Sequence, residues 1–170
     1  KYIVNCSGIE SIKIAKKLNK NLKLPKTNLV LGAYLYYPIR IFKHIIYQTF
    51  EPGKIIERVD ATPHINKGTI FGPSVEKGKN NIKWSKLKKR FYNSIKLYYP
   101  QIKFKLLSKY KFGLRPKIYY ENKNEVNDFY IKKSHNVINL LGIESPGLTS
   151  CLSIGKYVNK LIKLNEKNTI

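Results

Sequence analysis

The chain has 170 residues, of which 42% are apolar and 12% aromatic, and this composition predicts a globular chain with a real core. No apolar run approaches the roughly 20 residues of a membrane-spanning helix, and no transmembrane segment is expected. Three isolated histidines and two distant cysteines, Cys6 and Cys151, form neither a metal-binding pattern nor a disulfide framework.

The net charge of +23 raises the question of a nucleic-acid partner. Nearly all the positive charge is lysine, spread through the whole chain, and only four arginines occur. Isoleucine, asparagine and tyrosine are abundant together with lysine, which AT-rich codons would produce in any protein. We therefore expect a solvated basic surface, and a nucleic-acid partner is unlikely on this evidence; RNA, DNA or anionic lipid binding is the alternative.

The first half of the chain predicts a short αβ piece followed by strands. Residues 2–5 form a predicted strand, Gly8 a turn and residues 11–18 a helix. Residues 19–28 are a polar, lysine-rich connector. The strands predicted after it are 29–37, 40–50, 55–62 and 69–71.

The clearest predicted helix covers residues 84–99. Apolar side chains recur there at intervals of three or four residues, and Pro100 ends the pattern. Residues 110–120 and 128–132 return to predicted strands.

Residues 136–149, NVINLLGIESPGLT, predict a buried strand, a glycine turn and a helix start. Gly142 and Gly147 permit positive φ and close approach, as at a bound cofactor. Thr149 is a predicted N-cap for a helix over 150–164 with an apolar stripe. The free N–H groups and dipole at that helix start favour an anion or an electron-rich ring.

This stretch resembles the C-terminal signature of FAD-dependent oxidoreductases of the D-amino-acid-oxidase superfamily. Its GIESPGLT wording is similar to the 2-hydroxyglutarate dehydrogenase and oxidase-like branch, often described as FAD-dependent glycerol-3-phosphate dehydrogenase. Other stretches resemble family blocks in the same order: YIVNCSG at 2–8, FKHIIY at 42–47, FGPSV at 71–75, GLRPK at 113–117 and DFYI at 128–131.

The resemblance implies an α/β (α+β) fold, the C-terminal part of an FAD-binding flavoprotein with a mixed-sheet substrate layer. It places the end of the FAD-binding domain at 1–28, the substrate-binding sheet layer at 29–132, and the return to the FAD-binding domain at 133–170. The cofactor would be FAD, held by Asn5, Gly8, Gly142, Ile143, Glu144, Ser145, Gly147, Leu148 and Thr149. For Glu144, bonding to backbone N–H groups and contact with the ribityl chain both stay open.

Arg115 is the strongest functional residue predicted. It lies in an apolar strand between Gly113 and Pro116, where a partly buried guanidinium needs an anionic partner. In the family that the GLRPK block resembles, this arginine grips the substrate's carboxylate over the flavin. The alternative is a structural ion pair with Glu121 or Asp128.

Three more side chains are possible members of the site. Lys117 shares the strand face of Arg115 and would enlarge the anion site, or it is an ordinary solvated lysine. His44 and Tyr47 lie in the family-like strand at 42–47, and either of them faces the substrate or serves the core or surface. The resemblance implies that the catalytic base is a histidine outside this sequence.

These features predict oxidation of a small anionic 2-hydroxy acid such as 2-hydroxyglutarate, with hydride transfer to flavin. A polyol phosphate dehydrogenase is the alternative enzyme, and a degenerate flavoprotein that binds RNA or a membrane is the rival from another class. Two departures from the family stand out: Asp60 replaces an expected histidine, and no GxGxxG occurs. We therefore expect the C-terminal part of a longer mitochondrial or cytoplasmic enzyme, whose electron acceptor is unknown.

Overall fold

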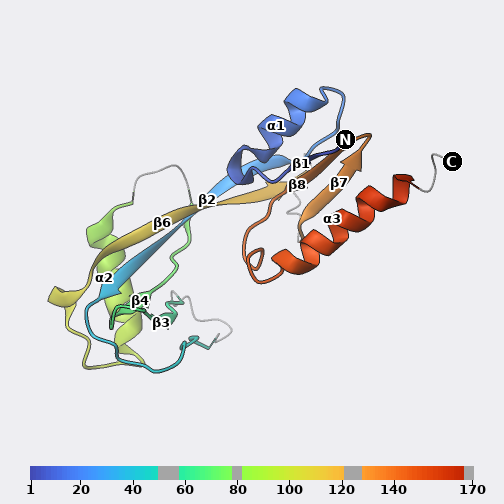
Figure 1. Cartoon of the computed structure of the whole chain (residues 1–170). Helices are drawn as coiled ribbons and strands as arrows, with labels where there is room; N and C mark the ends of the chain where they lie inside the picture. Colours follow the sequence, from blue (N-terminus) through green and yellow to red (C-terminus); the bar gives the residue numbers. More distant parts are fainter. Residues whose placement is uncertain (50–57, 78–81, 121–127, 167–170) are drawn as a thin grey trace. The chain divides into compact units, whose positions relative to one another are not determined.

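The computed structural model describes residues 1–49, 58–77, 82–120 and 128–166 (Figure 1). Its contacts divide the chain into two compact units. The first unit contains Lys1–Leu29 and Arg115–Ile170, and the second contains Val30–Leu114. Helices and two separate sheets confirm the expected mixed α/β class. Residues 115–120 and 128–132, expected in the sheet layer, group by contacts with the first unit.

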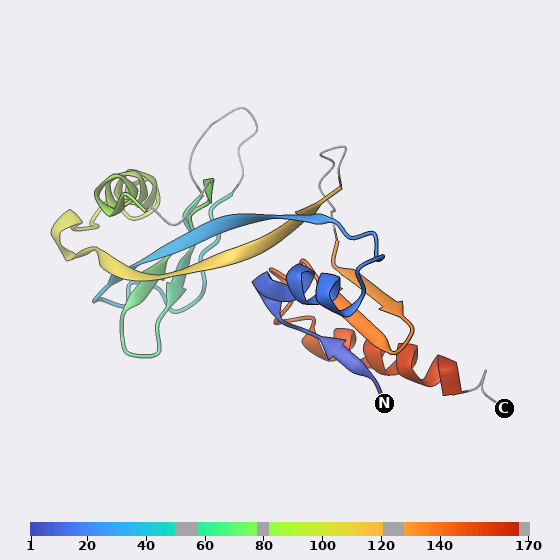
Figure 2. The same ribbon diagram turned by 90° about the horizontal axis from the view of Figure 1, so that it is seen from above.

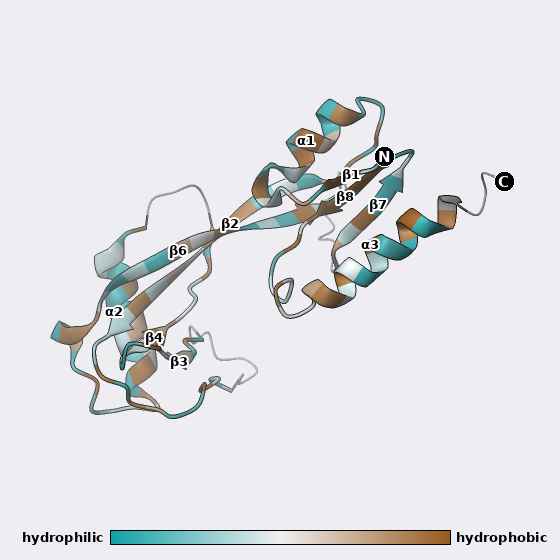
Figure 3. Ribbon diagram, in the orientation of Figure 1, coloured by the Kyte–Doolittle hydropathy of each residue, from teal (hydrophilic) through white to brown (hydrophobic). Residues whose placement is uncertain are grey.

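The first unit is built on a three-stranded sheet in the order β1-β8-β7. Strand β1 (Ile3–Asn5) runs parallel to β8 (Val137–Leu141), and β7 (Tyr130–Ser134) pairs with β8 in an antiparallel hairpin. The central strand β8 is apolar and almost entirely buried, as a strand with neighbours on both edges should be (Figure 3).

Two helices cover the faces of this sheet. Helix α1 (Ser11–Leu18) follows the 3-10 turn η1 (Gly8–Glu10), and α3 (Cys151–Glu166) follows β8. The views in Figures 1 and 2 agree that the sheet lies between α1 and α3. The apolar stripe predicted for the last helix is only half-buried, and Leu152 is 80% exposed, contrary to the expectation that it packs.

A pair of buried asparagines joins the parallel strands. Asn5 and Asn139 are register partners in β1 and β8. The Asn5 amide donates to Asn139 Oδ1 at 2.9 Å and to the backbone oxygen of Ser11 at 2.8 Å. Ser7 Oγ in turn donates to Asn5 Oδ1 at 2.5 Å. One side chain therefore fixes the strand register, the turn after β1 and the start of α1.

The second unit contains an antiparallel sheet in the order β3-β4-β2-β5, with β6 also paired to β2. Its strands are β2 (Lys26–Tyr37), β3 (Ala61–Pro63), β4 (Thr69–Phe71), β5 (Glu76–Lys77) and β6 (Ser108–Tyr119). The long strands β2 and β6 each have residues in both units.

Helix α2 (Trp84–Lys96) packs three apolar side chains into the second core. Leu87, Phe91 and Ile95 recur every four residues and are fully buried with Leu35 and Phe71 of the sheet. Pro100 and the 3-10 turn η2 (Phe104–Leu106) follow, so the helix ends close to where its sequence predicts.

The predicted strand over 40–50 is wrong for the residues that the structure describes. Between Arg40 and Thr49 it has a single bridge, from Ile46 to Ala61. A polar network replaces regular pairing: Gln48 Oε1 accepts from the Val59 backbone N–H and from Ser94 Oγ, both at 3.0 Å. The predicted strand over 55–62 reduces to β3, and its residues 55–57 lie outside the described residues.

In the described ranges, no helix is both long and apolar enough to cross a bilayer. The same residues contain no group of three His, Cys, Asp or Glu side chains that could hold a metal ion.

The asparagine pair generates a stability prediction. Asn5→Ala removes both donated bonds and leaves Asn139 Oδ1 and the Ser11 carbonyl without this partner, which should lower the free energy of unfolding by about 1–3 kcal/mol. Urea unfolding of the protein without cofactor measures this loss, with Asn93→Ala on the exposed face of α2 as the matched control. Equal unfolding midpoints for the two variants would contradict a structural role for Asn5.

Candidate functional site

The candidate site is the end of the first unit where β1 and β8 both terminate in glycine turns. In parallel strands the carboxyl ends meet at one edge of the sheet, which is where ligands bind in open α/β folds. Gly8 follows β1 with φ 58°, and Gly142 follows β8 with φ 69°. The two turns predicted to hold a cofactor are therefore brought together by the pairing of β1 with β8.

The two glycines of the GIESPGLT turn are needed for packing inside the protein. A Cβ on Gly142 would lie 2.8 Å from Ile118 Cδ1, in addition to the strain of its positive φ. A Cβ on Gly147 would lie 2.6 Å from Ile143 Cγ2 and 2.7 Å from the Glu144 carbonyl oxygen. Gly147 therefore closes the turn on itself, whereas the sequence had suggested close approach to a ligand.

An apolar pocket of about 440 Å³ opens beside these turns. Gly8 and Gly155 line it, and a Cβ on either would meet no atom within 4 Å, so both leave free space. No charged side chain lines the pocket. Its walls are Val4, Cys6, Gly8, Leu140, Ile143, Gly147, Cys151, Ile154, Gly155 and Val158. The pocket size is typical of small-molecule sites, and its lining suits an uncharged ring.

The start of α3 differs from the prediction. Thr149 Oγ1 and Ser150 Oγ both donate to the carbonyl oxygen of Pro146, at 2.9 and 3.0 Å. Among the described residues no backbone N–H donates to Thr149 Oγ1, and α3 begins only at Cys151, so Thr149 does not act as its N-cap. In the described part of the chain, the backbone N–H groups of Leu148 and Thr149 have no hydrogen-bond partner. These donors remain available to an electron-rich group.

The charged residues near this turn form a pair that the sequence did not predict. Lys117 Nζ on β6 lies 3.1 Å from Glu144 Oε1. The side chain of Glu144 is 20% exposed and that of Lys117 is 38% exposed, so the ion pair is partly screened by solvent. Lys117 and Glu144 were predicted separately, as an anion-site cation and a cofactor contact, and the structure joins them to each other.

Arg115 lies two residues before Lys117 on β6 and is half-buried. Among the described residues it has no ion pair and no hydrogen-bond partner. The alternative partner Asp128 instead accepts the backbone N–H of Phe129 at 2.6 Å, and Glu121 lies outside the described residues. No acidic side chain in the described part of the chain therefore occupies the Arg115 guanidinium.

The other predicted catalytic and substrate residues lie in the second unit. His44 is exposed, and Tyr47 is 63% exposed with the Arg58 guanidinium 5.5 Å from its ring centre. The packing inside either unit does not bring them to Arg115. Ser145 is exposed and does not line the apolar pocket.

Asp60 stands where a histidine was expected, and it belongs to a network that sequence reasoning missed. Asp60 Oδ1 accepts from Arg58 Nε at 3.0 Å, and the Tyr98 hydroxyl donates to the Val59 carbonyl at 2.9 Å. Burial, and to a smaller extent the charge of Asp60, raises the pKa of Tyr98 above its usual value, so this hydroxyl stays a donor. Tyr98 and Val59 are 39 positions apart, and no local pattern signals their contact.

Comparisons with known proteins support the resemblance found in the sequence. Residues 1–161 match the family described as FAD dependent oxidoreductase. The chain is 30% identical over 184 residues to L-2-hydroxyglutarate dehydrogenase, mitochondrial, of Arabidopsis thaliana, covering 95% of this chain and 38% of that protein. It is 27% identical over 183 residues to glycerol 3-phosphate dehydrogenase of Caloramator mitchellensis, covering 96% of this chain and 34% of that protein.

A solved structure shows the same fold. It is the dithionite-reduced L-alpha-glycerophosphate oxidase of Mycoplasma pneumoniae with FAD bound, which matches 96% of this chain and 43% of its own length with a TM-score of 0.72 at 20% identity. The chain spans less than half the length of each of these three proteins. Because the family pattern covers nearly all of its residues, this chain belongs to the FAD-dependent oxidoreductase family.

Proposed function

We propose that this chain forms part of an FAD-dependent oxidoreductase that oxidises a small 2-hydroxy acid whose carboxylate binds to Arg115. The observation that carries the proposal is the half-buried guanidinium of Arg115, which has no ionic partner among the described residues. A guanidinium in this state favours an anion that can accept two parallel hydrogen bonds. The Arabidopsis relative is named for such an acid, 2-hydroxyglutarate.

The residues present fit the flavin ring of FAD better than its pyrophosphate. The uncharged pocket bordered by Gly8 and Ile143, together with the N–H groups of Leu148 and Thr149, suits a flavin ring. Neither the pocket nor its turn offers a cation to a pyrophosphate. When bound, flavin supplies the acceptor for a hydride from the alcohol carbon. This chain's own residues would orient the substrate through Arg115 and exclude water with the apolar wall.

A carboxylate fits better than a phosphate as the group that Arg115 binds. A phosphate dianion favours a second cation, and the nearest one along the strand is Lys117. Its ammonium group is already 3.1 Å from Glu144, which reduces its attraction for a second anion. Because one relative is named glycerol 3-phosphate dehydrogenase, a phosphate substrate is the alternative. The hydroxy acid and glycerol 3-phosphate can be tested side by side.

Arg115 gives the first test of this function. Arg115→Ala should lower kcat/KM for 2-hydroxyglutarate by about 2–4 kcal/mol, or roughly 30- to 900-fold, because two charge-assisted bonds are lost and water compensates in part. Arg115→Lys keeps the charge without the planar fork, so its kcat/KM should lie between those of the unchanged protein and Arg115→Ala. FAD content and melting temperature should remain close to those of the unchanged protein.

The matched control is Lys111→Ala, which removes an exposed cation from the same strand. If Arg115→Ala oxidises the acid normally, Arg115 does not bind the substrate. A lower melting temperature with loss of FAD and normal kinetics in the remaining folded enzyme would instead identify a structural ion pair. Faster turnover of glycerol 3-phosphate than of the acid would favour the alternative substrate.

Lys117 provides a separate prediction. If its role is to hold Glu144, Lys117→Met should change the substrate KM by less than about twofold and destabilise the protein by no more than about 1 kcal/mol, since the pair is partly exposed. Steady-state kinetics and thermal unfolding measure the two effects. A tenfold rise in KM without any change in stability would restore Lys117 to the anion site.

A further inference from the structure

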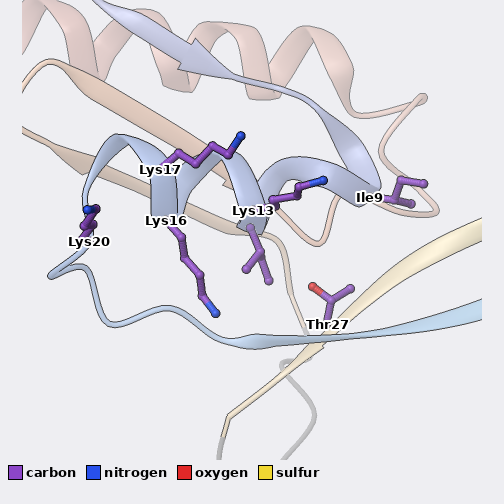
Figure 4. A pocket seen from close by; sticks show the side chains of 7 residues that line it. Ile9, Lys13, Lys16, Lys17, Lys20 and Thr27 are labelled. Carbon is purple, nitrogen blue, oxygen red and sulfur yellow. The ribbon is translucent and has the colours of Figure 1, made fainter.

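A second pocket in the first unit carries a concentration of positive charge that the proposed oxidoreductase site does not use. Its volume is about 520 Å³, and it lies beside α1 (Figure 4). Its lining residues are Ile9, Ile12, Lys13, Lys16, Lys17, Lys20 and Thr27. It shares no residue with the apolar pocket at the glycine turns.

The lysines of this pocket follow the repeat of a helix face. Positions 13, 16, 17 and 20 are spaced by three, one and three residues, so these side chains leave neighbouring positions of α1 and the turn after it. Figure 4 shows Lys16 extending toward the strand that carries Thr27, while the Lys13 and Lys17 side chains extend in other directions. Lys13 lies 3.1 Å from Glu10. Among the described residues, Lys16, Lys17 and Lys20 have no recorded ion pair or hydrogen bond. Like charges three and four residues apart destabilise a helix, so a bound anion would relieve repulsion.

The ordinary explanation for lysines at this place is the helix dipole, which favours cations in the last turn of α1. That explanation covers Lys16 and Lys17 but not the remaining features of the pocket. Thr27 lies on β2, outside the helix, and Figure 4 shows Lys16 and Thr27 reaching toward each other across the gap. The residues that line this pocket include one hydroxyl and four lysines but no carboxylate, and Glu10, outside the lining, pairs with Lys13.

The pocket also has an apolar part. Ile9 is 43% exposed and Ile12 is half-buried, and both line the same hollow as the lysines. A phosphate ion alone would leave these surfaces in water, and the pocket volume is that of a small-molecule site. The lining therefore suits a ligand that combines several phosphoryl groups with a flat, largely apolar ring system.

We propose that the pocket formed by Ile9, Ile12, Lys13, Lys16, Lys20 and Thr27 binds a nucleoside polyphosphate, with its phosphoryl groups on the lysines and Thr27 and its base on the isoleucines. This proposal is independent of the oxidoreductase site, since its residues are different. The binding is electrostatic in large part, so its affinity falls as salt rises.

The test uses calorimetric titration of the protein with ATP in the presence of a chelator, so that no metal ion contributes. ATP should bind more tightly than adenosine and more tightly than inorganic tripolyphosphate, because only ATP satisfies both parts of the pocket. Lys16→Gln/Lys20→Gln should weaken ATP binding at least about tenfold, since charge-assisted bonds are lost. Thr27→Val should weaken it about threefold to tenfold without changing the net charge.

The control is Lys86→Gln/Lys89→Gln, which removes two exposed lysines from one face of α2 in the second unit. It should leave ATP binding within about twofold. Circular dichroism confirms that each variant is folded, and glutamine suits a helix nearly as well as lysine.

Equal weakening by the two double variants would overturn the site in favour of diffuse surface charge. Failure of the unchanged protein to bind ATP would overturn it as well. If RNA or anionic phospholipid vesicles bind more tightly than ATP and lose binding in Lys16→Gln/Lys20→Gln, the surface serves that partner and the nucleotide assignment is wrong. Normal activity toward the hydroxy acid in this variant would leave the oxidoreductase proposal standing in every case.

Discussion

The buried amide pair between Asn5 and Asn139 is the interaction on which the candidate site depends. Parallel strands of only three and five residues offer few backbone bonds to fix their register. The side-chain bond at 2.9 Å excludes a shift by one residue, because the partner positions would then be apolar. Since the same amide also reaches the start of α1, the glycine turn after β1 is positioned by the bond that aligns the strands.

The consequence for function is that both glycine turns end at one edge of the sheet. Gly142 can adopt its positive φ beside Ile118 only without a side chain, and the turn that follows closes through Gly147. The unpaired N–H groups of Leu148 and Thr149 then lie in the turn immediately before α3. Asn5 thus positions, through the backbone, the end of the unit that we propose binds FAD. Its side chain is fully engaged within the protein, whereas the sequence had suggested direct contact with FAD.

The elements that could be predicted from the sequence are those whose pattern is complete within a short window. Helix α2 is one, because its apolar residues repeat every three or four positions and Pro100 ends it. The strand, turn and helix at 136–164 are another, because the glycines and the apolar run lie next to each other. Prediction failed over 40–46, where apolar residues occur in two adjacent pairs and only Ile46 finds a partner strand. An apolar stretch is compatible with extended backbone but does not supply the neighbour that makes a strand.

The candidate site was predicted less completely for the same reason. The chemistry of Arg115 follows from a cation placed in an apolar strand, but whether an acidic residue pairs with it depends on tertiary structure. The Lys117–Glu144 ion pair joins positions 27 residues apart, and each partner read alone suggested a different role. Thr149 has the right residue type for an N-cap, but α3 begins at Cys151 and the Thr149 hydroxyl donates a hydrogen bond to the Pro146 carbonyl three residues earlier. Residue type indicated which groups are chemically capable, and the fold decided which of them remain available.

The positive charges of this very basic chain also differ in whether they already have a partner within the fold. Lys117 has an acidic partner, and Lys88 lies with its ammonium group 4.6 Å from the centre of the Phe104 ring. Such contacts use a cation to stabilise the fold and weaken its attraction for a ligand. Arg115, Lys16 and Lys17 lack these contacts among the described residues, whereas Lys13 on the same helix pairs with Glu10. Arg115 is half-buried, where a lower effective dielectric strengthens a single ion pair, whereas the α1 lysines are exposed and gain strength only by acting together. In the two proposals, the first arrangement would select one carboxylate by geometry, and the second would select a polyanion by charge.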